Sequence, residues 1–242
     1  MLTFLSGSPA WAGRRLAATA LLAGLAWPLS AGAQAPKLQA FAAPGGKGHP
    51  VLVVSGQSGA ANYAPIAKDI AARGFAVWLV DGNDVFKANN AGEASFRAAV
   101  AQVRAAAGAA SGKIGVVGFS LGGGATMTYA ARMPDDVAAT VAVYPYTAFI
   151  ANPVAFVRQI KVPTLVLAAV KDDYKACCDI AMARKLGQDA KAAEVPLSVV
   201  EYGDANHGFV LAGPAFRKAD TTNALSRIAE HLTATLGPAP KP

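Results

Sequence analysis

The fold is decided by residues 113–132, which read KIGVVGFSLGGGATMTYAAR. The apolar run 113–117 predicts a buried strand, and 124–132 predicts a helix. Between them, Gly118-Phe119-Ser120-Leu121-Gly122 forms a Gly-x-Ser-x-Gly turn. Such a turn between a strand and a helix strains the serine backbone and exposes its hydroxyl above the sheet. Glycines on either side let the strand and helix pass closely. The stretch therefore predicts Ser120 as a nucleophile.

The remaining chain alternates apolar strands with helical stretches. A mostly parallel, doubly wound sheet with helices on both faces, the α/β class, is the expected result. Residues 36–48 are expected to be an extended entry segment or an edge strand. No internal repeat or linker interrupts residues 34–242, so they are predicted to form one domain. The further predicted strands are 50–54, 75–80, 137–143, 162–169 and 196–202, and the further helices are 63–73, 93–107, 176–189 and one within 214–236.

Composition favours a folded chain with a large core. Of 242 residues, 53% are hydrophobic and 15% are charged, which argues against disorder. The formal net charge is +7, but Arg14 and Arg15 contribute two of these charges. The remaining excess is dispersed, without a basic cluster interleaved with aromatic residues. We therefore expect no nucleic-acid partner.

Residues 1–33 resemble a secretory signal peptide. Arg14-Arg15 precedes a short apolar stretch, and Ala31-Gly32-Ala33 has the small-x-small pattern of a cleavage site. The apolar stretch is short for a membrane span. An uncleaved anchor is the alternative interpretation. We expect an exported protein, periplasmic or secreted, without stable membrane insertion after cleavage.

The two cysteines, Cys177 and Cys178, are adjacent. An oxidising compartment would favour a vicinal disulfide, whereas the close spacing of neighbouring Cα atoms disfavours one. Two buried thiols are the alternative. The cysteines do not have the spacing of a zinc site, and no metal or cofactor is expected.

A serine hydroxyl needs a base to become nucleophilic. The chain has three histidines, and His207 lies in a loop after a predicted strand. His49 lies at the amino end of a strand, and His231 lies in the last helix. Because reactive groups gather at the carboxyl ends of parallel strands, His207 is the expected base.

The imidazole in turn needs a carboxylate that fixes its tautomer. Chain order Ser, acid, His places this acid between Ser120 and His207. Asp172 directly follows a predicted strand and is favoured over its neighbour Asp173. Asp204 is a third candidate that fits a turn better. Chain order excludes Asp81 and Asp84 only weakly.

An oxyanion needs hydrogen-bond donors that are already in place. The backbone N–H of Leu121 is one expected donor. The second is the N–H of Gln57, in the small-residue loop 55–59 after the strand 50–54. Losing one such donor costs about 3 kcal/mol in the barrier. A plain turn is the alternative interpretation of this loop.

From residue 50 onward, the chain resembles the dienelactone hydrolase family of α/β-hydrolases. The resemblance rests on four motifs: Ser55-Gly56-Gln57-Ser58-Gly59, Gly118-Phe119-Ser120-Leu121-Gly122-Gly123, Lys171-Asp172-Asp173-Tyr174 and Asn206-His207-Gly208-Phe209. It implies an α/β-hydrolase fold with Ser120 as nucleophile, Asp172 as acid and His207 as base. The chain departs from the family where founding members have a cysteine nucleophile, where the usual His-Gly reads Ser55-Gly56, and where a glycine is replaced by Ala169. No basic residues are placed to hold a dienelactone carboxylate.

The expected site is shallow and open. Cap domains of this fold are usually inserted before the strand that carries the acid, and only residues 147–161 are available there, too few for a lid. A small-molecule ester-like substrate is therefore expected. Tyr144, Tyr174 and Phe209 are candidate pocket residues, with plain packing as the alternative. The predicted function is a serine hydrolase that forms an acyl-enzyme. An acyltransferase with the same triad and a non-catalytic binding protein are the competing hypotheses.

Overall fold

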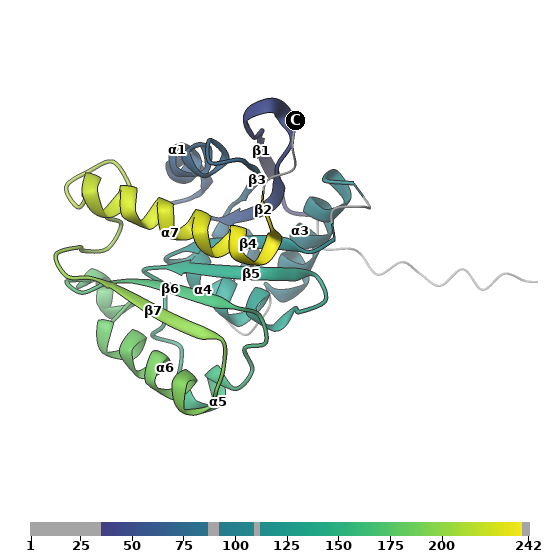
Figure 1. The fold of residues 1–242 in the computed structure, drawn as a ribbon. Helices are drawn as coiled ribbons and strands as arrows, with labels where there is room; N and C mark the ends of the chain where they lie inside the picture. The colour runs from purple at the N-terminus through teal and green to yellow at the C-terminus, as the bar shows by residue number, and fades with distance from the viewer. Residues whose placement is uncertain (1–34, 87–91, 109–111, 239–242) are drawn as a thin grey trace, which may run out of the picture. The chain divides into compact units, whose positions relative to one another are not determined.

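Seven strands form one sheet in the computed structural model, which describes residues 35–86, 92–108 and 112–238 (Figure 1). Their order is β1-β3-β2-β4-β5-β6-β7. All neighbouring strands pair in parallel except β1, which runs antiparallel to β3. The predicted, mostly parallel α/β sheet is thus confirmed. The strands are β1 (Leu38–Phe41), β2 (His49–Val54), β3 (Phe75–Val80), β4 (Ile114–Phe119), β5 (Val137–Val143), β6 (Thr164–Ala169) and β7 (Leu197–Tyr202).

The central strands are apolar on both faces because each face packs against helices. In β2, Val51 and Val53 contribute to one core, whereas Leu52 and Val54 contribute to the other. All four side chains are fully buried. A strand buried on both faces has a continuous apolar sequence, which is why these segments were recognisable.

Helices cover both faces of the sheet (Figure 1). On one face, α1 (Ala60–Ala71) and α7 (Lys218–Leu236) supply buried side chains to the core. On the other face lie α3 (Glu93–Ala106), α4 (Leu121–Thr128), α5 (Pro153–Val157) and α6 (Ile180–Ala192). The short elements are α2 (Gly82–Val85), η1 (Pro44–Gly46), η4 (Ala130–Arg132) and η5 (Tyr174–Ala176).

Three helices begin three or four residues away from the predicted start, and α1 is one of them, since it begins at Ala60 instead of at residue 63. Helix α4 begins at Leu121, directly after Ser120, instead of at residue 124, and a separate 3-10 turn follows it. Helix α6 begins at Ile180 instead of at residue 176, because the side chain of Asp179 accepts a hydrogen bond from Ala181 N and caps the helix there. The short helices α2 and α5 were not predicted.

The chain reverses its direction of strand addition next to β2. It passes from β2 to β3 and then returns to place β4 on the other side of β2. At such a switch point the loops after the two strands diverge and leave a crevice at their carboxyl ends. The loop after β2 and the Ser120 turn after β4 therefore face the same crevice.

The predicted signal peptide, residues 1–33, lies outside the described residues. Within 35–86, 92–108 and 112–238, none of the helices is both long and apolar enough to cross a membrane.

Candidate active site

Ser120 occupies a strained turn between β4 and α4. Its backbone has φ 52° and ψ −115°, a conformation that L-residues rarely adopt. Its N–H donates to Val143 O at 3.0 Å, and its carbonyl accepts from Gly124 N and Tyr146 N. These bonds hold the turn on both sides. The predicted strain at the serine is confirmed.

The flanking glycines are required by close packing. A Cβ on Gly118 would lie 2.1 Å from the carbonyl oxygen of Gly122. A Cβ on Gly122 would lie 2.3 Å from Val54 O and 2.5 Å from Ser55 O, both backbone atoms. Strand β4 and helix α4 therefore approach each other closely, as the motif predicted, and the end of β2 lies equally close to α4.

Ser120, His207 and Asp172 meet at the carboxyl edge of the sheet. Ser120 Oγ lies 2.9 Å from His207 Nε2, and His207 Nδ1 lies 2.8 Å from Asp172 Oδ2. The side chain of Asp172 is 0% exposed and that of His207 is 13% exposed. With Asp172 ionised, Nδ1–H donates to the carboxylate and Nε2 is left to accept the serine proton.

Local hydrogen bonds position the acid and the histidine. Asp172 Oδ1 accepts from Tyr174 N at 3.2 Å, so both carboxylate oxygens are engaged. The loop of His207 is joined to that of Asp172, because Lys171 N donates to Ala205 O at 2.9 Å. Asn206 Oδ1 in turn accepts from His207 N at 2.6 Å. The acid and the imidazole are thus held by neighbouring strands, β6 and β7.

The other candidate acids point elsewhere. Asp173 is exposed, and its N–H donates to Asn206 Oδ1. Asp204 pairs with Lys171 and Arg217 on the surface, which lowers its pKa. Asp81 caps α2. Among the described residues, Asp172 is the carboxylate that contacts His207.

Two tyrosine rings contact the imidazole. Tyr174 stacks on His207 with 4.5 Å between ring centroids and 10° between planes. Tyr144 meets it edge-on at 4.9 Å. Tyr144 is buried, and burial raises its pKa well above 10. These contacts restrict the orientation of the imidazole ring.

The aromatic prediction is only partly right. Tyr174 is 39% exposed and lines the pocket beside Ser120. Tyr144 and Phe209 are buried in the core and do not line that pocket. Their placement as pocket residues was wrong, because an aromatic residue at a strand end can turn inward as well as outward. Phe209 packs against Tyr202 and Tyr144 instead.

The loop after β2 orients the N–H of Gln57. The carbonyl of Gly56 accepts from Gly59 N at 3.1 Å and from Ser55 Oγ at 3.1 Å. In a trans peptide the N–H points opposite to the C=O, so the N–H of Gln57 faces away from these partners. Within the described residues, neither this N–H nor that of Leu121 donates a hydrogen bond.

Ser55 has a role that the sequence did not reveal. It is fully buried, and its hydroxyl both donates to Gly56 O and accepts from Gly82 N at 3.0 Å. It thereby ties the loop after β2 to the turn after β3. At Gly56, a Cβ would lie 2.3 Å from Tyr63 Oη and 3.1 Å from Ser120 Cβ. The loop thus needs glycine at this position.

A pocket of about 250 Å³ opens beside Ser120 and His207. Tyr63, whose pKa burial raises to about 12, forms part of its wall and is neutral at physiological pH. The segment after His207 forms the opposite wall; sequence reasoning missed it because its small residues carry no motif. The lining residues are Gln57, Ser58, Tyr63, Ser120, Tyr174, His207, Gly208, Leu211, Ala212, Gly213, Pro214 and Ala215.

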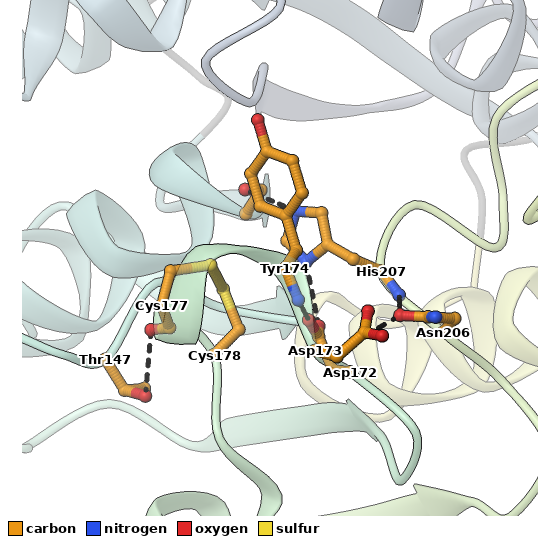
Figure 2. Close-up of a disulfide and its surroundings, with 9 residues drawn as sticks. Thr147, Asp172, Asp173, Tyr174, Cys177, Cys178, Asn206 and His207 are labelled. Carbon is orange, nitrogen blue, oxygen red and sulfur yellow. Dashed lines mark hydrogen bonds and ion pairs between the residues drawn. A yellow bond between two sulfur atoms is a disulfide. The ribbon is translucent and has the colours of Figure 1, made fainter.

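Cys177 and Cys178 form a vicinal disulfide in the loop after Asp172 (Figure 2). This resolves the alternative between a disulfide and two thiols. Figure 2 shows the bond close to Asp172 and His207, with Tyr174 in front of the imidazole. Thr147 N and Ala148 N donate to the carbonyl of Cys177 and fasten the loop to the end of β5.

The sheet, the serine turn at its switch point and the helices on both faces define an α/β-hydrolase fold. The chain belongs to the dienelactone hydrolase family, whose model matches residues 82–236. It is therefore a hydrolase that acts on ester bonds. The match includes Ser120, Asp172 and His207 but begins after Gln57, so it covers less of the chain than the resemblance from residue 50 suggested.

Solved structures of other proteins have the same fold. A Klebsiella pneumoniae protein assigned as a dienelactone hydrolase is 17% identical with a TM-score of 0.66, over 81% of this chain and 99% of that one. The Pyrococcus furiosus esterase Pf2001 is 14% identical with a TM-score of 0.62, over 84% and 93%. Propionate-bound Est2, an esterase of Thermogutta terrifontis, is 17% identical with a TM-score of 0.59, over 85% and 91%. No curated protein matches the sequence.

Proposed function

We propose that the protein hydrolyses small carboxylic esters or lactones through an acyl-enzyme formed on Ser120. The observation that carries this proposal is the continuous chain of hydrogen bonds from Ser120 Oγ through His207 to Asp172. His207 Nε2 takes the serine proton as the hydroxyl attacks the carbonyl, and later returns it to the leaving group. A water activated by the same nitrogen then releases the acid.

Two backbone N–H groups bind the oxyanion in this proposal. Leu121 N lies at the start of α4, where the helix dipole adds a partial positive charge. Gln57 N belongs to the peptide whose carbonyl is fixed by Gly59 and Ser55. Neither N–H has a partner among the described residues, so neither must break a bond to bind a substrate oxygen.

The pocket favours a short acyl group. Its volume is about 250 Å³, and small residues from 212 to 215 form much of one wall. The segment 144–163, before β6, contains one short helix, α5, and no inserted cap. Est2 of Thermogutta terrifontis, which shares the fold, was solved with propionate bound. We infer that acetyl and propionyl esters are preferred over long acyl chains.

The decisive experiment is Ser120→Ala. Hydrolysis of p-nitrophenyl acetate should fall at least about a thousandfold, since loss of the nucleophile removes the covalent route. Ser198→Ala, at an exposed position of β7, is the matched control and should keep the parent rate. A fluorophosphonate probe should label the parent chain and Ser198→Ala but not Ser120→Ala. Retained turnover or labelling in Ser120→Ala would refute the assignment.

We also infer export, as the signal-like residues 1–33 suggest. The disulfide between Cys177 and Cys178 supports this inference, because such bonds persist in oxidising compartments. Cell fractionation of the full chain tests it. Recovery of the mature protein in the cytoplasmic fraction would contradict export.

A further inference from the structure

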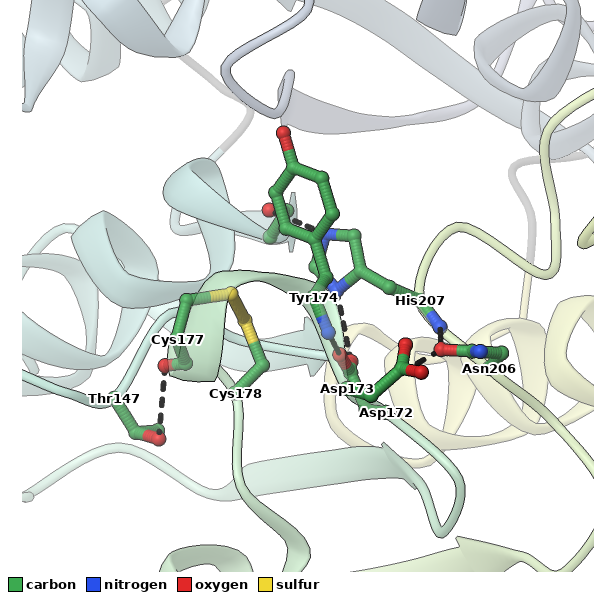
Figure 3. A network of polar contacts seen from close by, with 9 residues as sticks. Thr147, Asp172, Asp173, Tyr174, Cys177, Cys178, Asn206 and His207 are labelled. Carbon is green, nitrogen blue, oxygen red and sulfur yellow. Dashed lines mark hydrogen bonds and ion pairs between the residues drawn. A yellow bond between two sulfur atoms is a disulfide. The ribbon is translucent and has the colours of Figure 1, made fainter.

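Four potential metal ligands gather around the disulfide. Asp172, Cys177, Cys178 and His207 each offer one ligand atom, and these atoms all lie within 4.8 Å of one another (Figure 3). They come from two loops that are far apart in sequence, so the spacing of the cysteines did not predict the cluster. In the disulfide form the two sulfur atoms are bonded to each other and are poor ligands for a cation.

We propose that reduction of the Cys177–Cys178 bond opens a zinc site that shuts off the catalytic histidine. The ligands are the two thiolates, a ring nitrogen of His207 and the carboxylate of Asp172. The inhibitory part of this proposal rests on the proposed function, whereas zinc binding itself does not. The proposed inhibition is reversible, because re-forming the disulfide removes the two thiolate ligands and makes the enzyme insensitive to zinc again.

The chemistry balances with a dithiol as reductant. The dithiol gives two electrons and two protons to the disulfide, becomes a disulfide itself, and leaves two thiols on the protein. Zinc then binds two thiolates as the two thiol protons leave to solvent. Zinc accepts thiolate, imidazole and carboxylate ligands in a four-coordinate, tetrahedral site.

The distances suit this geometry. Bonds of about 2.0–2.3 Å to zinc place tetrahedral ligand atoms roughly 3.3–3.8 Å apart. The four ligand atoms already lie within 4.8 Å of each other, and the bonded sulfurs are the pair that must separate. The longest of these separations exceeds the tetrahedral range by no more than about 1 Å.

The backbone of the cysteine loop is held independently of the disulfide. Thr147 N and Ala148 N donate to Cys177 O at 2.9 and 3.0 Å, and Cys177 N donates to Tyr174 O at 3.0 Å. On the other side, the bond from Lys171 N to Ala205 O joins the loops of Asp172 and His207. Reduction removes a covalent bond between neighbouring residues but leaves these anchors in place.

Zinc at this cluster disables the base whichever nitrogen of His207 it takes. If Nε2 binds the metal, its lone pair is unavailable to Ser120. If Nδ1 binds, the neutral ring carries its proton on Nε2, which then cannot accept the serine proton. Asp172 is also drawn away from its role on the imidazole. Zinc binding at this cluster and ester hydrolysis are therefore mutually exclusive.

The test compares oxidised and reduced full-length protein with Zn²⁺ as the probe. After removal of the reductant, equilibrium dialysis should find one zinc per reduced chain and none per oxidised chain. Cobalt in place of zinc should give a thiolate-to-metal charge-transfer absorption in the reduced chain alone. One equivalent of zinc should lower hydrolysis by the reduced chain at least about tenfold, with recovery on adding a chelator.

Variants separate this proposal from the proposed function. Ser120→Ala, which lacks the nucleophile, should still bind one zinc when reduced. Cys177→Ser/Cys178→Ser should bind none, and its hydrolysis, expressed relative to its own zinc-free rate, should not respond to zinc. His207→Gln should bind zinc at least about tenfold more weakly, because loss of a ligand costs no less than loss of an outer-shell partner.

Three results would overturn the inference. Equal zinc binding by oxidised and reduced chains would place the metal elsewhere. Absence of zinc from a reduced chain whose circular dichroism matches the oxidised form would show that no site exists. Unchanged zinc affinity in His207→Gln, together with undiminished hydrolysis by the reduced parent chain when zinc is bound, would leave the histidine outside the site.

Discussion

Two aspartates stand next to each other after β6, and one of them contacts the imidazole. Asp172→Asn keeps the size of the side chain but can present an amide N–H where the carboxylate accepted a hydrogen bond from Nδ1–H, which favours the wrong tautomer of His207. We expect kcat to fall about 10³–10⁴-fold with little change in the unfolding midpoint. Steady-state kinetics on p-nitrophenyl acetate measure this.

Asp173→Asn is the matched control for that substitution. Asp173 is exposed and makes no side-chain contact with His207, so its rate should stay close to the parent. A comparable loss in both variants would mean that a general change of charge near the pocket, and not the bond to Nδ1, controls the rate.

Single residues were predictable where a motif fixed their chemistry. The turn around Ser120 and the order of serine, acid and histidine were sufficient to find the hydrogen-bonded set. The direction in which a side chain turns was not predictable. Phe209 and Tyr144 were predicted to line the pocket but lie in the core. The hydrogen bond that buried Ser55 accepts comes from Gly82, which is 27 residues further along the chain, so no local pattern could reveal it.

The junction of β2, β4 and α4 leaves no room for a side chain at Gly122. Alanine in place of glycine normally favours a helix by about 1 kcal/mol. At Gly122 the new Cβ would meet Val54 O at 2.3 Å and Ser55 O at 2.5 Å, and backbone atoms cannot yield as side chains do. Overpacking costs about 1–3 kcal/mol or more. Gly122→Ala should therefore lower the unfolding free energy by about 1–2 kcal/mol and reduce hydrolysis, as urea denaturation and kinetics can measure.

Gly203→Ala provides the comparison. A Cβ at Gly203 would have no heavy atom within 4 Å, so both stability and rate should remain near the parent values. If Gly122→Ala matched Gly203→Ala, the close approach of the three elements would not constrain the chain.

Elements were predictable when they were apolar or strongly periodic. The observed bounds of β3 and β5 are the predicted ones, because uninterrupted apolar runs such as 75–80 and 137–143 are typical of strands in a parallel sheet covered on both faces. The start of α6 was misplaced by four residues. The intervening loop contains a 3-10 turn and the disulfide, and its fold depends on Thr147 and Ala148 after a different strand. Such contacts between distant segments carry no local pattern.

The stability of the whole molecule should depend on pH through His231 in α7. Burial lowers the pKa of this imidazole below 6.5, although its hydrogen bond to Pro163 O at 3.2 Å acts in the opposite direction. The folded chain therefore binds fewer protons here than the unfolded chain, and stability falls as the pH drops below about 6.5. His231→Gln, whose amide can still donate to a carbonyl, should lose less stability between about pH 7.5 and about pH 5.5.

Urea denaturation of both chains at the two pH values tests this. Carboxylates titrate in both chains alike, so the difference between the chains isolates His231. An equal loss of stability would exclude it as an acid-sensitive group.

The alternation of strands and helices in the sequence predicted a parallel sheet but not the order of its strands. A parallel sheet was expected, but the position of β4 beside β2, which brings the serine turn and the Gln57 loop together, required the structure.

The loop that carries His207 is joined to α7 by hydrogen bonds. Thr221 in α7 donates its hydroxyl to Phe209 O, and Arg217 N, just before the helix, donates to the same carbonyl. The turn of Ser120 is held instead by hydrogen bonds with Val143 of β5, with Tyr146 just after it, and with Gly124 of α4. Fraying of the first turn of α7, where Thr221 lies, would therefore loosen the loop of the proton acceptor while the turn of the nucleophile stays in place.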